Sequence, residues 1–235
     1  MRSYIIHLPG DRRRAANARH LLESLPGARL VDAVRGAAMR ETTPTRPGDL
    51  HRPRYPFPLS DGEIGCFLSH RACWERIALG PDPYALVVED DMAADPDLWA
   101  RAMALVAAHA GPDHLIRLPA KPRETPARSL AENGPARLFL PRVIGLQTVA
   151  QVVGRNAARR LLAASETLDR PVDAFLQLHW VTGQPVHTIL PSGVRELTAE
   201  LGGSTIQTGK GGLKPARELA RALYRARVAL RPQRP

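Results

Sequence analysis

The chain has 235 residues, of which 44% are hydrophobic and 24% charged, and its formal net charge is +10. This length suits one folded domain with a sizeable core, and the hydrophobic content excludes a disordered chain. Residues 210–235 hold eight basic residues and one acid, so this tail carries +7 and an anionic partner is expected mainly there.

The first 36 residues have the pattern of a strand, a helix and a second strand. Residues 3–8 form a short apolar run, Asp11 can cap a helix, and residues 28–34 form the second apolar run. Such a βαβ unit predicts an α/β sheet. Residues 41–58 contain five prolines and predict a long irregular loop, either a flap near a site or an exposed insertion.

A helix is predicted from residue 60 to Gly80, because Ser60 and Glu63 fit a capping box. On this helix Glu63, Cys66 and His70 share one face. An acid, a thiol and an imidazole in this arrangement suit a metal site or a nucleophile site. The same three residues also suit a helix cap, a buried small side chain and a hydrogen-bonded histidine.

Residues 84–88 form an apolar run that ends in Glu89, Asp90 and Asp91. Such a run predicts a strand buried on both faces. The acids follow its carboxyl end, which is the sheet edge where α/β proteins bind ligands. Because Mg²⁺ and Mn²⁺ prefer oxygen ligands, the cluster predicts a cation site. The alternative is an acidic loop that opens the next helix.

The second half of the chain predicts shorter elements. Asp95 and Pro96 start a helix that ends near residue 111, and Asn156 can cap another. The remaining ranges are a strand at 114–118, a polar loop at 119–135, a hairpin of strands 137–140 and 143–153, a helix at 172–180 and a last strand at 185–190. Asp173 lies in the first turn of its helix, where the helix dipole favours a carboxylate.

The C-terminal tail predicts a basic amphipathic helix, in which an apolar stripe that includes Leu219 and Leu223 faces away from arginines at 217, 221 and 225. We expect the helix over 214–231 to anchor the protein at an anionic membrane surface. The alternatives are nucleic-acid binding, a partner helix, and a helix docked on the domain with its arginines in water. Aromatic residues make up only 5% and no known module is visible, so we expect no nucleic-acid partner.

Two observations bear on location in the cell. Cys66 and Cys73 lie seven residues apart on one predicted helix, or roughly 10 Å along its axis, which is too far for a disulfide. No stretch has the order of a signal peptide, and no apolar run approaches the roughly 18 residues of a membrane span. We therefore expect a cytoplasmic protein that is either soluble or peripheral to the inner membrane.

Four segments, taken in order, resemble glycosyltransferase family 25, the lipopolysaccharide or lipooligosaccharide biosynthesis type. They are residues 5–14, 32–36, 62–70 and 86–91. The most specific part is "GEIGC-x-x-SH" at 62–70, followed by an apolar strand that ends in "EDD". Weaker matches occur at 153–158, 171–173 and 204–206, and Ala150-Gln151 departs from the aromatic residue expected there.

The resemblance implies an α/β, GT-A-like (Rossmann-like) fold, with a mixed, mostly parallel sheet flanked by helices over residues 1–209 and a basic tail at 210–235. It also implies transfer of a hexose, most often galactose, from a nucleotide sugar such as a UDP-sugar to a cell-envelope glycan such as lipopolysaccharide. The expected cofactor is Mn²⁺ or Mg²⁺. A catalytically inactive, glycan-binding family member and a basic nucleic-acid-binding protein are the alternatives, and a thiol enzyme built on Cys66 and His70 is a third.

The resemblance also assigns roles to residues of this chain. It implies that Glu89 and Asp91 bind the metal ion. Asp173 is the candidate general base of an inverting transfer, in which a carboxylate takes the proton of the acceptor hydroxyl. The predicted donor contacts are Leu8, Arg13, Arg14, Asp32 and Asp90, and the predicted substrate-positioning residues are Glu63, Ser69 and His70. The two arginines either contact the nucleotide phosphates or are solvated.

Overall fold

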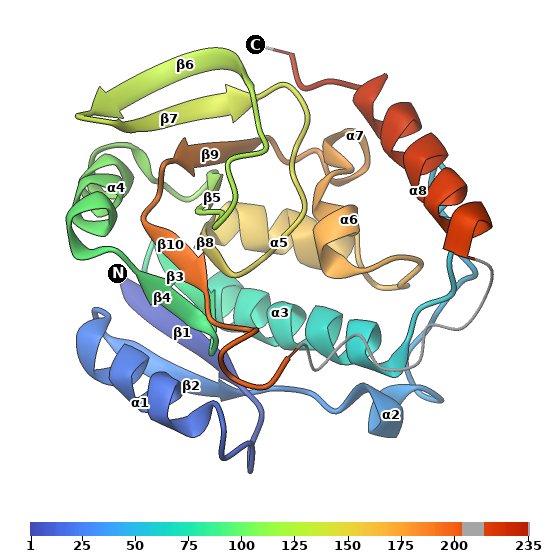
Figure 1. Ribbon diagram of the computed structural model, residues 1–235, viewed down its shortest axis with the longest axis horizontal. Helices are drawn as coiled ribbons and strands as arrows, with labels where there is room; N and C mark the ends of the chain where they lie inside the picture. Colours follow the sequence, from blue (N-terminus) through green and yellow to red (C-terminus); the bar gives the residue numbers. More distant parts are fainter. Residues whose placement is uncertain (204–213, 235) are drawn as a thin grey trace.

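The computed structural model describes residues 1–203 and 214–234, and its centre is a sheet of eight strands (Figure 1). The strands lie in the spatial order β2 (Ala28–Asp32), β1 (Arg2–His7), β3 (Tyr84–Glu89), β8 (Ala150–Gly154), β5 (Leu115–Arg117), β9 (Val186–Leu190), β7 (Ala136–Pro141) and β6 (Pro126–Asn133). A separate antiparallel pair joins β10 (Val194–Glu196) to β4 (Met92–Ala94). The predicted βαβ start is confirmed, because β1 and β2 pair in parallel.

The sheet is mixed, as predicted. Parallel pairing joins β1 to β2, β1 to β3 and β5 to β9. The other four pairings in the described part of the sheet are antiparallel. The share of parallel pairings is therefore smaller than expected for a mostly parallel sheet. The physical reason is local: β8 runs antiparallel between β3 and β5, and a hairpin of β6 and β7 extends the edge beyond β9.

Helices cover both faces of the sheet (Figure 1). In chain order they are α1 (Ala15–Ser24), α2 (Gly36–Met39), α3 (Asp61–Leu79), α4 (Pro96–His109), α5 (Arg155–Ala163), α6 (Val172–Leu176), α7 (His179–Thr182) and α8 (Lys214–Ala229). One core cluster packs α3, α5 and α6 against one face, and the other packs α1 and α4 against the opposite face. Val87 belongs to the first cluster, and Leu86 and Val88 to the second, so β3 is buried on both faces as its apolar run predicts.

Two predicted helix starts are confirmed. Ser60 and Glu63 form the reciprocal capping box of α3. Asp95 caps α4 by accepting a hydrogen bond from the Leu98 amide at 3.0 Å, and Pro96 occupies the first turn. Such caps satisfy amide groups that no helical carbonyl can reach, and each contributes on the order of 1 kcal/mol.

The predicted hairpin of residues 137–153 is wrong. β7 pairs instead with β6, which lies within the predicted polar loop, and the segment before β8 is irregular. The turn between β6 and β7 contains Gly134, whose φ of 60° suits the tight turns that join antiparallel strands. β6 is largely exposed at the edge of the sheet, so it needs no apolar pattern to form.

The predicted single helix at 172–180 is two short helices. α6 ends at Leu176 and α7 begins at His179, because Leu178 has non-helical angles (φ −86°, ψ 52°). The predicted cap Asn156 lies inside α5, and its side-chain amide is 3.3 Å from the Asp113 carboxylate. These differences move element boundaries but leave Asp173 in the first turn of its helix.

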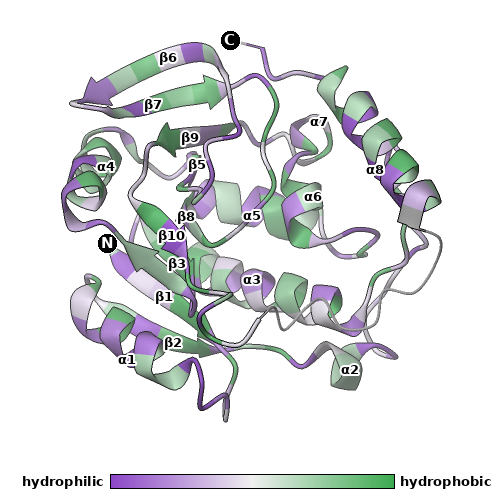
Figure 2. Cartoon of the chain, in the orientation of Figure 1, coloured by the Kyte–Doolittle hydropathy of each residue, from purple (hydrophilic) through white to green (hydrophobic). Residues whose placement is uncertain are grey.

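The C-terminal helix α8 is confirmed, but two leucines of the predicted apolar stripe are not on the face that docks on the domain. Tyr224 and Val228 are buried, whereas Leu219 and Leu223 are 61% and 50% exposed. The Tyr224 hydroxyl accepts a hydrogen bond from Arg170 at 3.2 Å. Figure 2 shows hydrophobic and hydrophilic residues alternating along α8. The predicted domain boundary at 209/210 and the resemblance at 204–206 lie outside the described residues.

None of the helices in residues 1–203 and 214–234 combines the length and the apolar character that crossing a bilayer requires.

Gly65, inside the "GEIGC" segment, allows α3 to lie against the chain that follows β2. A Cβ atom at this position would overlap the Val34 carbonyl oxygen and lie 2.9 Å from the Gly36 amide nitrogen. We therefore expect Gly65→Ala to lower the free energy of unfolding by about 1–3 kcal/mol. The backbone clash outweighs the roughly 1 kcal/mol that alanine gains over glycine in a helix.

Urea unfolding measures this effect, with Gly111→Ala as the control. A Cβ atom at Gly111 would lie 3.4 Å from His114 Nδ1, which is an ordinary contact. An unchanged urea midpoint for Gly65→Ala would contradict the prediction.

Candidate active site

A cavity of about 1640 Å³ opens beyond the carboxyl end of β3. It exceeds the roughly 300–1,000 Å³ of a usual small-molecule pocket. Its lining comes mainly from residues 55–60, the end of β3, residues 146–149, residues 171–174 and one side of α8. The cavity therefore lies at the sheet edge where α/β proteins bind ligands.

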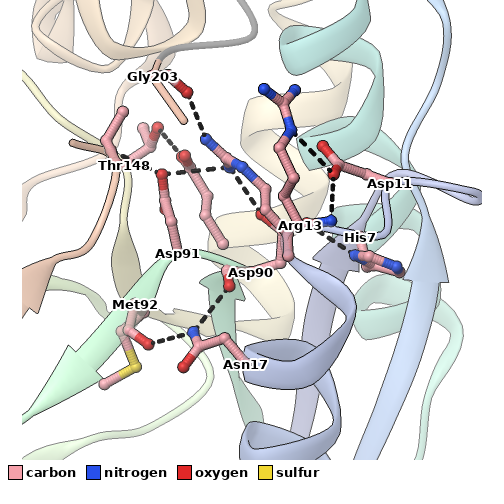
Figure 3. Close-up of polar contacts among 12 residues, drawn as sticks. His7, Asp11, Arg13, Asn17, Asp90, Asp91, Met92, Thr148 and Gly203 are labelled. Carbon is pink, nitrogen blue, oxygen red and sulfur yellow. Dashed lines mark hydrogen bonds and ion pairs between the residues drawn. The ribbon is translucent and has the colours of Figure 1, made fainter. Parts of the chain in front are cut away.

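The three acids at the carboxyl end of β3 lie in two different surroundings. Glu89 and Asp91 line the cavity, whereas Asp90 is 4% exposed and belongs to a buried network. Its carboxylate contacts His7 Nδ1 at 2.8 Å and Arg14 Nη1 at 2.7 Å, and the contact with His7 is drawn in Figure 3. Successive side chains at the strand end point in alternate directions, so Glu89 and Asp91 face the cavity and Asp90 faces the buried network beneath it.

The two cavity carboxylates differ electrostatically. Burial acts to raise the pKa of Glu89, but contacts with His70 and Thr148 outweigh burial and hold that pKa below its usual value. Burial and then the charge of Glu89 raise the pKa of Asp91, although its Oδ2 accepts from the Thr198 hydroxyl at 2.7 Å. A bound cation would relieve the repulsion between the two acids.

The oxygen atoms at this point fit a hard divalent cation. The Asp91 Oδ1 atom is buried and lacks a hydrogen-bond partner among the described residues, which is uncommon for a buried carboxylate. Glu89 and Thr148 add further oxygen atoms, joined by a hydrogen bond of 2.7 Å. Mg²⁺ and Mn²⁺ favour such ligands. Arg14, whose Nη1 lies 3.2 Å from Asp91 Oδ2, already supplies one positive charge here.

His70 lies beneath Glu89 and does not line the cavity. The imidazole is fully buried, with Nε2 3.3 Å from Glu89 Oε1 and Nδ1 3.0 Å from the side-chain amide of Gln151. If the amide donates to Nδ1, then Nε2 carries the proton and donates to Glu89. Gln151, which departs from the aromatic residue expected there, therefore helps to orient His70, and His70 acts through Glu89.

The other two predicted positioning residues have structural partners. Glu63 lines the cavity, but its Oε2 accepts from the Ser60 amide and hydroxyl, each at 2.8 Å. Ser69 is 1% exposed, donates to the Gly65 carbonyl at 2.6 Å and accepts from the Val34 amide at 2.9 Å. The Ser69 hydroxyl therefore joins α3 to the end of β2 and does not reach the cavity.

Among the predicted donor contacts in the described chain, Arg14 is the one that lines the cavity. Arg13 is exposed and lies 3.4 Å from the Gly202 carbonyl oxygen. Asp32 is exposed at the end of β2, and the Leu8 carbonyl accepts from the Asp11 amide at 3.1 Å in the turn after β1. The structure therefore brings together Arg14, Glu89 and Asp91, whereas the other four predicted donor contacts, Leu8, Arg13, Asp32 and Asp90, do not line the cavity.

Asp173 reaches the same cavity from α6. Its Oδ1 accepts from the Ala174 amide at 2.7 Å, and burial raises its pKa above the usual value for an aspartate. Its Oδ2 lies 3.5 Å from the Gln147 amide. The cavity thus joins a third carboxylate to the pair at the end of β3, and this carboxylate has the raised pKa that suits a general base.

The sequence did not point to the segment that carries Gln147 and Thr148. Gln147 has a φ of 91°, an unusual backbone angle for a residue other than glycine. Arg117, buried on β5, donates to the Leu146 and Gln147 carbonyls at 2.6 and 3.0 Å and pairs with Glu124. These contacts join residues up to 30 positions apart, so no local pattern could have revealed this wall of the cavity.

A mixed α/β sheet flanked by helices, with acids beyond a central strand, defines a GT-A-like protein. The family described as "Glycosyltransferase family 25 (LPS biosynthesis protein)" matches residues 1–176. The chain therefore belongs to glycosyltransferase family 25. The match includes the acids of β3 and Asp173 but ends before α8.

Curated relatives agree with this family. The "Probable inactive glycosyltransferase 25 family member 3" of Bos taurus is 32% identical over 180 residues, which are 71% of this chain and 29% of that protein. The "Procollagen galactosyltransferase 1-B" of Xenopus laevis is 38% identical over 85 residues, or 34% of this chain and 14% of that protein. The chain thus matches less than a third of the length of either relative.

Proposed function

We propose that this protein transfers a hexose, galactose in the first instance, from a UDP-sugar to a cell-envelope glycan such as lipopolysaccharide. The observation that carries the proposal is the pair Glu89 and Asp91 in one large cavity, with a buried and unpartnered Asp91 oxygen among the described residues. Membership of family 25 supports the reaction class. The galactosyltransferase among the relatives supports the choice of sugar.

Glu89 and Asp91 would hold the Mn²⁺ or Mg²⁺ ion. When bound, such an ion stabilises the negative charge that develops on the leaving diphosphate. Thr148 and His70 keep Glu89 ionised and fixed in direction, while Arg14 offers a positive charge beside Asp91. Asp90 ties Arg14 and His7 to the end of the strand, so that the cavity groups keep their positions before the donor binds.

Asp173 is the proposed general base, and the proposed transfer inverts the configuration of the sugar. In such a reaction a carboxylate removes the proton of the acceptor hydroxyl as that oxygen attacks the sugar carbon. Asp173 lines the cavity on a different element from the cation-binding acids, which would place it on the acceptor side.

We further propose that the protein works in the cytoplasm, at the inner-membrane surface. Leu219 and Leu223 of α8 and Leu230 beyond its end are 61%, 50% and 81% exposed, and Arg227 is an exposed arginine of the same helix. Apolar side chains flanked by arginines suit an anionic lipid surface. Co-sedimentation with anionic vesicles that is lost in Leu219→Glu/Leu223→Glu is the expected result, and unchanged co-sedimentation would contradict it.

The direct test is a donor screen with UDP-galactose, UDP-glucose and other nucleotide sugars, in Mn²⁺ and in EDTA. Mn²⁺-dependent release of UDP from one donor is the expected result. Binding of UDP and Mn²⁺ without release would instead favour the catalytically inactive alternative, because several relatives are named as inactive family members. The nucleic-acid alternative loses support, because the family that matches residues 1–176 is a glycosyltransferase family.

The cavity also contains Cys66, whose Sγ lies within 4.8 Å of a ligand atom of His70 and of Glu89. Burial raises the pKa of Cys66 well above its usual value, and that of Cys73 to about 12, so both remain thiols at neutral pH. A thiol is a poor nucleophile. We therefore expect Cys66→Ala to change UDP release by less than about threefold, or about 0.7 kcal/mol of transition-state stabilisation.

Steady-state rates of wild type and Cys66→Ala check this prediction, with circular dichroism as the control for folding. A folded variant that has lost its activity would support the thiol enzyme instead.

A further inference from the structure

Helix α8, which lies beyond the family match, supplies one wall of the cavity. Arg217, Arg221 and Arg225 are spaced four residues apart, so they follow one face of the helix over successive turns, and all three line the cavity. Tyr224 lines it beside them. The same cavity thus has carboxylates at the end of β3 and a row of guanidinium groups on α8.

Aromatic rings hold two of these arginines in place. The guanidinium carbons of Arg217 and Arg221 lie 5.2 and 5.4 Å from the centre of the Phe57 ring. The Tyr55 ring packs edge-on against Phe57 at 5.8 Å and against Tyr224 at 5.2 Å. Arginine stems and rings packed in this way keep positive charge fixed at the cavity wall.

One arginine of this wall has an acid beside it on the same helix. Glu218 pairs with Arg221, but it points outward from an exposed position on the same helix. Arg225 lines the cavity and forms no ion pair with any described residue. Guanidinium groups recognise phosphates and carboxylates through paired hydrogen bonds. The wall therefore complements an anion and not a neutral ligand.

We propose that the α8 wall binds a negatively charged group, a phosphate or a carboxylate, carried by the acceptor glycan. This inference rests on the proposed glycosyltransfer. The donor diphosphate belongs at Glu89 and Asp91, where the cation would bind, and the aromatic rings beside the arginines offer a surface for a sugar ring. The tail outside the family match would then select the acceptor, while the matched residues bind the donor.

The test compares glucose 6-phosphate, glucuronate and glucose as probes, by titration calorimetry with wild type, Arg225→Gln and Arg221→Gln/Arg225→Gln. Glucose 6-phosphate, glucuronate or both should bind wild type at least about tenfold more tightly than glucose, and this preference should disappear in the double variant. The two anionic probes show whether phosphate or carboxylate is preferred. Rising salt should weaken the binding of the preferred probe.

Arg227→Gln is the matched control, because Arg227 is an exposed arginine of α8 that does not line the cavity. It should bind as wild type does, and all variants should bind UDP with Mn²⁺ as wild type does. If wild type does not bind UDP in the presence of Mn²⁺, that result would count against the proposed function itself. Equal binding of glucose and both anionic probes, or equal loss in Arg227→Gln, would overturn the acceptor inference. Arg225→Gln keeps the test valid if the double variant unfolds.

Discussion

Replacing Asp91 with asparagine should lower UDP release by at least about 100-fold. The amide has nearly the same shape as the carboxylate, so Thr198 and Arg14 keep a neighbour, but the cavity loses one of the two charges that would hold the proposed cation. Because burial raises the pKa of Asp91, the folded protein favours the neutral form of this side chain. The variant should therefore be as stable as wild type at neutral pH.

The measurement is the rate of UDP release together with the melting temperature. Asp97→Asn is the control, because Asp97 is exposed in the first turn of α4 and does not line the cavity. Unchanged activity in Asp91→Asn would exclude a functional cation site at Asp91. Lost activity with a collapsed melting temperature would show that Asp91 has a structural role instead.

Asp173→Asn should reduce kcat for transfer by about 10²–10⁴-fold, with little change in the KM for the donor. Asparagine can still accept the hydrogen bond from the Ala174 amide, so α6 should keep its start. It cannot take a proton from the acceptor. A kcat close to that of wild type would exclude Asp173 as the base.

The pH dependence gives a second readout for Asp173. A base acts only when ionised, so activity is present above its pKa and is lost as the pH falls through it. Burial raises this pKa, and the acidic limb of kcat should therefore lie above the usual aspartate value of about 3.9. The residual activity of Asp173→Asn should lack this limb.

Sequence patterns predicted the elements whose signals are local. β3 has an unbroken apolar run, and α3 and α4 begin with side chains that cap their own backbone. The hairpin of β6 and β7 was missed because an exposed edge strand needs no apolar alternation. Residues 143–149 resembled a strand in composition, but the angle at Gln147 and the contacts of Arg117 make them an irregular wall.

The sequence predicted the acids of the candidate site but not the residues that hold them in place. Glu89, Asp91 and Asp173 do line one cavity, while Ser69 and Asp90 face the interior. The resemblance to family 25 singled out Glu89 and Asp91, but the ends of distant strands and helices meet only in three dimensions. The face that α8 presents was also misjudged, because arginine stems pack against Phe57 as well as apolar residues do.

The central claim is that Glu89 and Asp91 bind a nucleoside diphosphate through a divalent cation. Calorimetric titration of UDP tests it most directly, because binding is measured whether or not the protein turns over a donor. UDP should bind in Mn²⁺ and lose at least about tenfold in affinity, or about 1.4 kcal/mol, both in EDTA and in Asp91→Asn. Equal affinity for UDP with and without Mn²⁺, or in wild type and Asp91→Asn, would contradict the claim.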